Sequence, residues 1–386
     1  MAPDILASVT TLNGTTVALD SGLNGDPAAL EVDRAVGELR RGRAIRIVDG
    51  QRCALAAAIE TVQRPLFRRL LEAARGSLAL ILTTERAEAA GLADRSAGTV
   101  AVRCNGAELD ELRALGGMCS TRVAHPSAFR VTSWTGSTAL AAAGFQLAKA
   151  GRLLPALVGF QTPRFDDASI VTVTVDDVAR HAGFVLHNLK CTSQARVPLA
   201  DAEESRIALF RDDHALGEHI AVVIGNPDLD AVVPVRLHSA CLTGDLLGSL
   251  RCDCGEQLRS AVRRIAALGG GVLLYLDQEG RGIGLANKLR AYAVQDLGFD
   301  TVDADRHLGF HADERNYDVA AALLKELGIS RIQLLTNNPQ KISALQEHGI
   351  EVVGRLPLVG STNTHNERYL RAKRERAGHL AEDSGV

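Results

Sequence analysis

Two kinds of apolar spacing alternate through most of this chain. Apolar residues three and four positions apart, typical of amphipathic helices, are separated by short runs of valine, isoleucine and leucine, typical of buried strands. The first spacing predicts helices over residues 26–42, 66–76, 135–151, 256–271, 319–328 and 339–349. The buried runs predict strands over residues 44–50, 77–84, 218–226, 232–239, 271–278, 329–338 and 350–358. Such alternation favours a mixed α/β (α/β or α+β) fold.

The length of 386 residues favours two domains, because a single core seldom grows that large. Residues 189–213 are more polar and less periodic than their neighbours, which puts the domain boundary near residue 192. We therefore expect a first domain over residues 27–191 and a second over residues 192–380, each with a sheet flanked by helices. An irregular lead (residues 1–26) and a disordered tail (residues 381–386) complete the expected organisation.

The composition excludes several classes of protein. The formal net charge of −3 argues against a general nucleic-acid binder, which carries a basic excess. The first residues lack a basic start followed by an apolar core, so no signal peptide is expected, and no apolar run approaches the length of a membrane span. Seven cysteines, four of them scattered, do not suit a secreted disulfide framework. The expected setting is the cytoplasm.

Three cysteines gather in the stretch CLTGDLLGSLRCDCGEQL, residues 241–258. Cys241, Cys252 and Cys254 offer thiolates, which are among the best ligands of zinc. Three protein ligands leave one tetrahedral position for water, the catalytic arrangement, in which zinc lowers the pKa of water to roughly 7. A fourth ligand from His238 or His311 would make the site structural instead. Ordinary thiols in a glycine-rich turn are the remaining interpretation.

Two later segments predict anion binding. A glycine run after a buried strand, in QEGRGIGLANKLRAYAVQD, places Arg281, Lys288 and Arg290 near the start of a helix, where backbone N–H groups attract anions. After the strand in LLTNNPQK, Thr336 and Lys341 are expected at the carboxyl edge of the sheet, where α/β sheets bind ligands. Each segment taken singly is also compatible with a solvated, capped loop.

In HADERNYD, Asp313 and Arg315 are two positions apart, so an extended segment would place both on one face. This spacing predicts an ion pair, and it does not by itself indicate a catalytic role.

Five motifs, in order along residues 192–380, closely resemble the GTP cyclohydrolase II family. They are RLHSACLTGDLLGSLRCDCGEQL, YLDQEGRGIGLANKLRAYAVQDLGFDT, LGFHADERNYD, LLTNNPQKI and NERYLRAKRERAGHL. The resemblance implies a homodimeric enzyme, dependent on zinc and Mg²⁺, that opens the imidazole ring of GTP in the first step of riboflavin biosynthesis. The implied products are 2,5-diamino-6-(5-phosphoribosylamino)pyrimidin-4(3H)-one, formate and pyrophosphate.

The resemblance also implies roles for single residues. The three clustered cysteines would hold zinc, whose water attacks C8 of the guanine, and Tyr292 would assist the ring hydrolysis. Arg315 would attack the α-phosphorus to release pyrophosphate, with Asp313 as proton acceptor. The positions that would contact GTP are Arg236, Leu237, His238, Ser239, Ala240, Gln257, Glu279, Gly280, Arg281, Thr301, Thr336 and Lys341.

Two positions depart from the residues that the family usually has. Ala240 stands where a glutamate usually precedes the first zinc cysteine, and Asp277 stands where an arginine usually precedes QEGR. The second change reverses a charge near the expected triphosphate. These departures leave open a paralogue that acts on another nucleotide, and a paralogue that retains the formyl group is a separate alternative, which Tyr292 disfavours. A catalytically silent nucleotide-binding protein is a further alternative, which the intact cysteines disfavour.

The first half of the chain resembles dihydroxybutanone-phosphate synthase in GELRRGRAIRIVDG, SLALILTTERAEAAGL and FRVTSWTGSTALAAAG. That family binds magnesium and substrate through an acidic run after its first strand and a later Gly-His-Thr segment. Here the first strand ends in Asp49 and Gly50, and no histidine occurs between His125 and His181. Since a hard cation needs several oxygen ligands, we expect a degenerate domain without synthase activity that serves in dimerisation or regulation.

Overall fold

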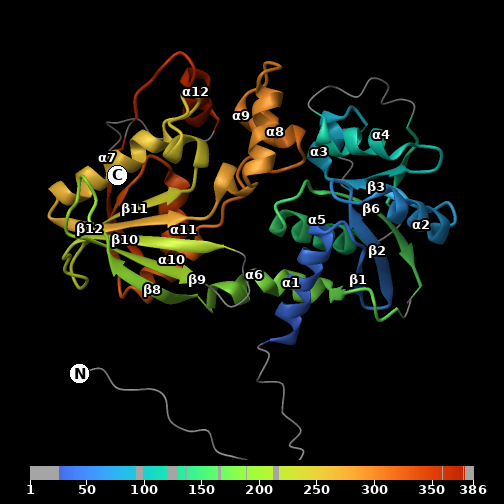
Figure 1. Cartoon of the computed structure of the whole chain (residues 1–386), viewed down its shortest axis with the longest axis horizontal. Coiled ribbons are helices and arrows are strands. Elements are labelled where there is room, and N and C mark those ends of the chain that lie inside the picture. The colour runs from blue at the N-terminus through green and yellow to red at the C-terminus, as the bar shows by residue number, and fades with distance from the viewer. Residues whose placement is uncertain are drawn as a thin grey trace, which may run out of the picture.

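The computed structural model describes residues 26–92, 99–119, 129–134, 137–163, 167–187, 189–211, 217–358, 360–376 and 378. These residues form two seven-stranded sheets, each flanked by helices, with two further helices between them (Figure 1). The predicted mixed α/β fold, with two domains each built on a sheet, is confirmed. The expected lead, up to residue 25, and the tail over residues 381–386 lie outside the described residues.

The first sheet belongs to the N-terminal half of the chain. Its strands are β1 (Ile45–Asp49), β2 (Arg52–Ala58), β3 (Ala79–Leu82), β4 (Val100–Arg103), β5 (Val131–Ser133), β6 (Ala156–Thr162) and β7 (Thr172–Thr174). Their order is β5-β4-β3-β6-β2-β1-β7, and only the β1–β7 pair is parallel. Side chains alternate between the two faces along β2, so Leu55 and Ala57 join one apolar core while Ala54 and Ala56 join the other.

Helices cover both faces of this sheet. They are α1 (Pro27–Arg40), α2 (Arg64–Ala74), α3 (Thr84–Ala89), α4 (Leu109–Arg113), α5 (Thr138–Ala150) and α6 (Val175–His187). Helices α1, α5 and α6 pack on one face, and α2, α3 and α4 pack on the other. The side chains of Asp26 and Ser137 accept hydrogen bonds from the backbone N–H groups of Ala28 (2.9 Å) and Ala139 (3.2 Å), which caps α1 and α5.

The second sheet belongs to the C-terminal half. Its strands are β8 (Lys190–Arg196), β9 (Ser205–Arg211), β10 (Glu218–Gly225), β11 (Val233–Ser239), β12 (Gly270–Leu276), β13 (Arg331–Leu335) and β14 (Glu351–Leu356). Their order is β14-β13-β11-β12-β10-β9-β8, parallel from β14 to β12 and antiparallel from β12 to β8. Helices α10 (Asp318–Glu326) and α11 (Pro339–Glu347) cover one face, and α7 (Cys254–Ala267) covers the other.

The polar stretch over residues 189–213 contains regular structure that its sequence did not predict. It supplies β8 and β9, the antiparallel strands at one edge of the second sheet. Every residue of β8 is exposed, because an edge strand without a covering helix buries neither face. The alternation of apolar and polar residues on which strand prediction depends is therefore absent there.

Three more helices complete the second half: α8 (Leu285–Gln295), α9 (Thr301–His307) and α12 (Glu367–Glu375). Helices α8 and α9 lie between the two sheets, and α9 packs against α3 of the first domain (Figure 1). In the described part of the chain, every helix is too short or too polar to span a bilayer.

Candidate active site

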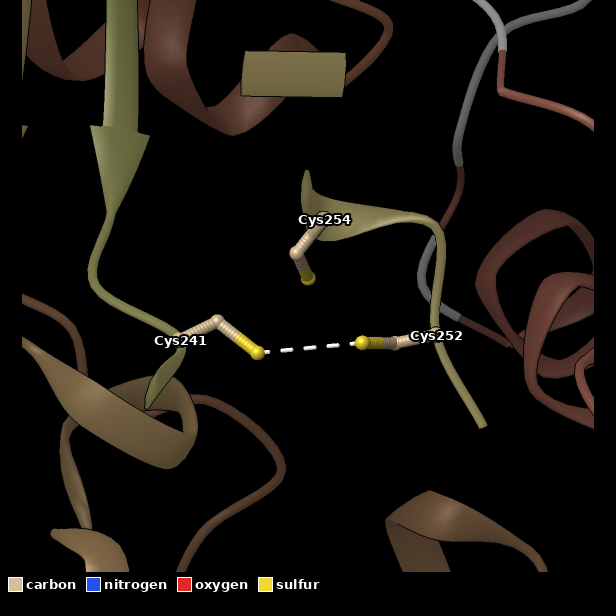
Figure 2. Close-up of side chains that lie close together, drawn as sticks. All are labelled: Cys241, Cys252 and Cys254. Atoms are coloured by element: carbon tan, nitrogen blue, oxygen red, sulfur yellow. Dashed lines mark hydrogen bonds between the residues drawn. The ribbon is translucent and has the colours of Figure 1, made fainter. Parts of the chain in front are cut away.

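The three clustered cysteines meet at the carboxyl end of β11. Cys241 follows that strand, while Cys252 and Cys254 lie at the start of α7 (Figure 2). Their sulfur atoms all lie within 4.8 Å of one another, and the Cys241 and Cys252 sulfurs are 3.7 Å apart. Among the described residues, no other group of three or more cysteine, histidine or carboxylate side chains gathers as closely. The fold therefore brings together the residues that the sequence proposed as metal ligands.

The space around these sulfurs suits a metal ion. Gly244 faces them, and a Cβ atom at this position would lie 2.7 Å from the Cys252 sulfur and 3.0 Å from the Cys241 sulfur. The glycine thus keeps room beside the thiol groups that any side chain would fill. Three thiolates are a donor set that zinc favours, so the residues present fit this ion.

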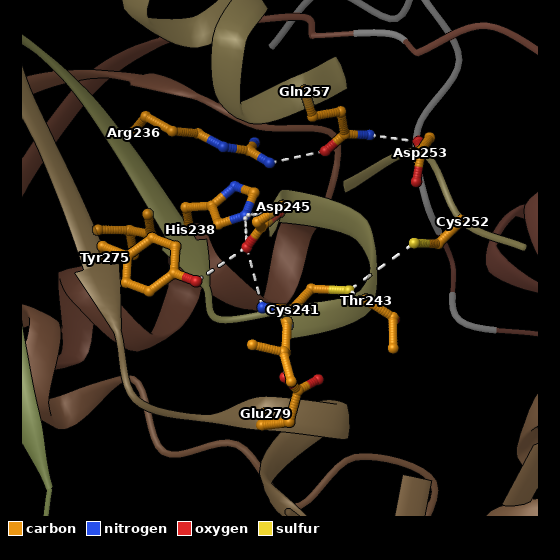
Figure 3. Close-up of polar contacts among 12 residues, drawn as sticks. Arg236, His238, Cys241, Thr243, Asp245, Cys252, Asp253, Gln257, Tyr275 and Glu279 are labelled. Carbon is orange, nitrogen blue, oxygen red and sulfur yellow. Dashed lines mark hydrogen bonds and ion pairs between the residues drawn. The ribbon is translucent and has the colours of Figure 1, made fainter. Parts of the chain in front are cut away.

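The carboxylate of Asp245 holds the first cysteine in place (Figure 3). It accepts hydrogen bonds from the backbone N–H of Cys241 (2.9 Å) and the hydroxyl of Tyr275 (3.0 Å), and it lies 3.2 Å from Nε2 of His238. Burial lowers the pKa of His238, so its ring is neutral at neutral pH. Asp245 lies in the helical turn η4 (Leu242–Leu246), which directly follows the cysteine.

Neither histidine considered as a fourth ligand belongs to the cluster. His238 is engaged by Asp245, and its ring stacks on that of Tyr275 with centroids 5.6 Å apart. Nδ1 of His311 lies 3.2 Å from a carboxylate oxygen of Glu85 in the first domain. The arrangement found among the described residues is that of a three-cysteine site.

A buried lysine completes the surroundings of Cys241. Nζ of Lys288 donates to the Cys241 sulfur (3.0 Å), the Thr243 hydroxyl (2.9 Å) and the Glu279 carboxylate (2.8 Å). Burial opposes the charge of Lys288, but the bonds to Glu279 and Cys241 prevail and raise its pKa. Hydrogen bonds from Cys252 and Cys254, and then from Lys288, lower the pKa of Cys241 and so favour its thiolate form.

The three cations predicted to bind an anion have different partners in the structure, and the anion site itself stays a prediction. Lys288 donates to a cysteine thiolate and a carboxylate instead of facing an open helix start. Arg290 reaches Glu60 of the first domain, at 2.8 Å. Arg281 and Lys288 both line the cavity, and Nη1 of Arg281 is 3.7 Å from a carboxylate oxygen of Asp305.

A chain of polar contacts links the segment of Cys252 and Cys254 to the second sheet (Figure 3). Asp253, between Cys252 and Cys254, accepts from the Gln257 amide (2.5 Å), whose oxygen accepts from Arg236 (2.7 Å). Arg236 also donates to the carbonyl of Leu335, at the end of β13 (2.9 Å). The loop that carries two of the sulfurs is thus tied to β11 and to the end of β13.

A cavity opens beside the sulfurs, and many of the predicted residues line it. The predicted residues in its wall are Ser239, Ala240, Cys241, Cys252, Cys254, Glu279, Gly280, Arg281, Lys288, Tyr292, Thr301 and Arg315. Residues that the sequence did not propose for the site complete the wall, notably Arg251, Asp305 and Tyr369. Arg281 has a φ of 63°, in the left-handed region that is rare for a residue with a side chain. Strained backbone of this kind is common at functional sites.

The other predicted residues, Arg236, Leu237, His238, Gln257, Asp313, Thr336 and Lys341, do not line this cavity. Several of them lie behind its wall, where Arg315 and Lys341 approach the ring of Tyr317, at 5.4 and 5.6 Å. Lys341 donates to the carbonyl of Leu237 (2.7 Å), and Thr336 is almost fully buried. The buried Tyr317 hydroxyl has no hydrogen-bond partner among the described residues.

Asp313 and Arg315 form the ion pair that their spacing predicted. Nε of Arg315 donates to the Asp313 carboxylate at 2.8 Å, and a second guanidinium nitrogen contacts the other carboxylate oxygen. Burial opposes the charge of both groups, but their mutual hydrogen bonds prevail. They lower the pKa of Asp313 and raise the pKa of Arg315. The guanidinium at the cavity wall therefore stays positively charged.

Comparison with known proteins assigns the chain to a family. The model of the family described as GTP cyclohydrolase II matches residues 190–357. A protein of Azospirillum brasilense named GTP cyclohydrolase-2 is 44% identical over 378 residues, which cover 92% of this chain and 95% of that protein. The chain belongs to the GTP cyclohydrolase II family. The prediction that it is an enzyme of this family is thereby confirmed.

Other relatives of the GTP cyclohydrolase II family show how far the similarity extends. GTP cyclohydrolase-2 of Xylella fastidiosa is 40% identical over 361 residues, covering 92% of this chain and 88% of that protein. The same-named protein of Azotobacter vinelandii is 56% identical over 171 residues, 44% of this chain and 82% of its own length. Some members thus share both halves of this chain, while others match a single segment of it.

The solved structures found by similarity are less informative. A two-domain 3,4-dihydroxy-2-butanone 4-phosphate synthase from A. baumannii aligns with 79% of this chain and 93% of its own, at 17% identity and a TM-score of 0.31. That score indicates a poor overall superposition, so the resemblance of the first domain to this synthase stays a prediction.

The sequence did not reveal the residues that support the cysteines. Asp245 lies four positions after Cys241, but no motif distinguishes it from an ordinary turn aspartate. Asp305 and Tyr317 follow predicted residues closely, on the helix that begins at Thr301 and in the loop of Asp313 and Arg315, but neither was itself proposed. Their proximity to the site arises only when α9 and α10 pack beside the second sheet.

Proposed function

We propose that this protein hydrolyses GTP to 2,5-diamino-6-(5-phosphoribosylamino)pyrimidin-4(3H)-one, formate and pyrophosphate, the first step of riboflavin biosynthesis. The observation that carries the proposal is the juxtaposition of three cysteine sulfurs with Arg281 and Arg315 in the wall of one cavity. A hydrolytic centre and a binding site for a polyanion are then next to each other. A nucleoside triphosphate that is opened at its base and cleaved at its phosphates requires both.

Cys241, Cys252 and Cys254 would hold one zinc ion. When bound, zinc with three protein ligands supplies Lewis acidity that activates water for hydrolysis near neutral pH. Asp245 orients Cys241 by accepting from its backbone N–H, and Lys288 favours its deprotonated form by donating to its sulfur.

Tyr292 lies in the cavity wall, with the Arg251 guanidinium 4.7 Å from its ring centroid. Burial raises the pKa of its hydroxyl, which therefore remains protonated and able to donate to a ring nitrogen of the guanine. We assign Tyr292 to the ring-opening half of the reaction. A phenol that keeps its proton is suited to general-acid assistance.

Asp313 and Arg315 belong to the phosphate half of the reaction. Nucleophilic attack by Arg315 on the α-phosphorus requires loss of a proton, and the hydrogen bonds to Asp313 raise the pKa of the guanidinium instead. We therefore assign Arg315 to stabilising the charge that develops when pyrophosphate leaves, with Asp313 orienting it. Mg²⁺ would accompany the phosphates.

The remaining contacts with GTP are proposed at positions on the cavity wall and behind it. They are Arg236, Leu237, His238, Ser239, Ala240, Gln257, Glu279, Gly280, Arg281, Thr301, Thr336 and Lys341. We also propose a cytoplasmic homodimer that binds neither nucleic acid nor membranes, with a first domain that lacks synthase activity.

A direct assay separates this proposal from its alternatives. Zinc-loaded protein is incubated with GTP and Mg²⁺, the pyrimidine product is identified by mass, and formate and pyrophosphate are measured enzymatically. Equal amounts of all three products are expected. A product that keeps the formyl mass would identify the paralogue, and unchanged GTP would contradict any cyclohydrolase activity.

A further inference from the structure

The first domain touches the second where the cavity residues lie. Apart from the packing of α6 on α10, its described contacts fall on four segments of the second domain: the loop before Glu279, the loop around Glu314, helix α8 and the end of helix α9. Each of these segments carries residues that line the cavity or adjoin it.

The C-terminal end of α5 holds the first two segments. Nζ of Lys149 lies 2.6 Å from the carboxylate of Glu314, the residue between Asp313 and Arg315. Arg152, just after α5, donates to the carboxylate of Asp277 at 2.5 Å. Asp277 immediately precedes the segment Gln278–Arg281, which forms one wall of the cavity.

The carboxylate of Asp277 therefore has a partner in the first domain. The sequence suggested that this aspartate reverses a charge near the triphosphate, but Asp277 does not line the cavity. It pairs with Arg152, whose φ of 57° lies in the left-handed region that residues with a side chain seldom adopt. Close approach here also needs Gly284, since a Cβ at that position would lie 3.0 Å from Cβ of Arg152.

Helix α8 is held by two further contacts. The side-chain amide of Asn287 donates to the carbonyl of Arg152 (3.0 Å), and Arg290 donates to Glu60 (2.8 Å). Asn287 and Arg290 lie on either side of Lys288, which donates to the Cys241 sulfur. Tyr292 lies on the same helix, about one turn after Lys288.

The end of α9 is held by buried groups. Arg86, which is 1% exposed, donates to the carbonyls of His307 and Leu115 and so bridges both domains. The Thr83 hydroxyl donates to the carbonyl of Gly309 at 2.9 Å. Leu154 of the first domain joins an apolar cluster whose other members belong to the second, namely Ile283, Ala291, Val294, Ala304, Leu308 and Phe310.

We propose that the first domain is a positioning domain for the cyclohydrolase site, and that the Arg152–Asp277 and Lys149–Glu314 pairs set the loops that carry Arg281 and Arg315. The inference rests on the proposed function for its effect on catalysis. Exposed ion pairs contribute little to stability, but these pairs join two domains at loops that bear cavity residues. A displacement of such a loop by about 1 Å can slow a reaction on the order of a hundredfold.

A charge-swap cycle tests the proposal. Arg152→Asp and Asp277→Arg each place two like charges together, and each is expected to lower kcat/KM for GTP by about tenfold. The double variant restores an opposite pair, and its kcat/KM is expected within about twofold of wild type. Zinc content and circular dichroism stay unchanged throughout. Aspartate also tolerates the positive φ at position 152.

The matched control is Arg331→Glu, which disrupts the exposed Arg331–Glu351 pair far from the cavity and leaves kcat/KM unchanged. A second cycle, with Lys149→Glu and Glu314→Lys, repeats the test if one swapped variant folds poorly. A double variant no more active than its single variants, or single variants as active as wild type, would overturn the proposal.

Amide hydrogen exchange makes the result independent of GTP turnover. Exchange over residues 278–282 and 313–316 is expected to be faster in each single variant and to return to the wild-type rate in the double variant. If the wild type itself leaves GTP unchanged, the proposed function fails while the exchange cycle still tests the positioning role. Identical exchange in all four proteins would refute that role.

Discussion

Charged side chains of the same type have different partners in this protein. Lys288 donates to a cysteine thiolate and a carboxylate, whereas Lys341 donates to a backbone carbonyl beneath the cavity. Arg315 is paired with Asp313 and keeps its charge at the cavity wall, whereas Arg236 is buried and its pKa falls to about 10. Chemical role here depends on the partner that packing provides.

Replacement of one sulfur tests the metal centre. Cys252→Ser substitutes a poor zinc ligand at a site with three thiolates, so the bound zinc is expected to fall from one per chain to near none, with at least about a hundredfold loss of GTP hydrolysis. Metal analysis of the purified variant provides the measurement. Cys191→Ser, at an exposed cysteine on β8, is the control and should keep its zinc. Full zinc content in Cys252→Ser would refute the assignment.

Replacement of the cavity arginine separates metal binding from phosphate chemistry. Arg315→Ala removes the guanidinium but no sulfur, so zinc content stays at the wild-type level while pyrophosphate release falls by about a hundredfold or more. Arg315→Lys, which keeps a charge without the paired hydrogen bonds, is expected to be intermediate. Loss of zinc in Arg315→Ala would show that the arginine supports the metal centre instead.

The helical turn η4 lies in the chain between Cys241 and the pair Cys252 and Cys254. It contributes residues next to the sulfurs that are not themselves proposed as zinc ligands. Its Thr243 hydroxyl accepts from Lys288, and its Gly244 faces the sulfurs. The carboxylate of Asp245 accepts from the backbone N–H of Cys241. Helix α7 then carries Cys254 in its first turn. A short turn and a helix start together determine where the three sulfurs meet.

Gly244→Ala tests the shape of this turn. The added methyl group would lie 2.7 Å from the Cys252 sulfur, which is too close for an undisturbed site. Zinc affinity is expected to fall by about tenfold to a hundredfold, measured by competition with a chromophoric chelator. Leu246→Ala, in the same turn but 73% exposed, is the control and should bind zinc normally. Equal affinities in the two variants would contradict the close approach.

The two domains form one unit around α8 and α9, and a buried carboxyl group lies at their junction. Asp305, on α9, is 3% exposed and lies 3.7 Å from Arg281. Burial raises its pKa to about 7, and the Arg281 charge opposes this only in part. The folded protein therefore holds a proton on Asp305 at pH values where the unfolded chain has released it.

This proton makes stability depend on pH. Because the folded pKa is raised, the stabilising contribution of Asp305 is complete below its unfolded pKa and is lost as pH rises through about 7. Asp305→Asn cannot ionise, so its stability relative to wild type should rise between about pH 5 and pH 8, by roughly 2 kcal/mol. Thermal unfolding at several pH values measures this. Asp201→Asn, at an exposed carboxylate, is the control, and parallel pH profiles for all three proteins would contradict the prediction.

Several of the elements that bury an apolar face could be predicted from sequence, because burial imposes a period on the residues. Helices α1 and α10 and strands β11 and β12 follow such periods, and the cysteine spacing singled out the three residues whose sulfurs the fold brings together. The Asp313–Arg315 pair was equally accessible, since an extended segment brings every second residue to one face. Strand β8 was not, because it buries neither face.

The partners of the site residues could not be predicted, because they come from segments far apart in the sequence. Nothing near Lys288 indicates that it will reach Cys241, 47 positions earlier, or that Asp277 will meet Arg152, 125 positions earlier. Such contacts exist only after the two sheets have packed around α8 and α9. Local periodicity and ligand spacing are properties of the chain itself, whereas charge pairing and the closure of the cavity are properties of its packing.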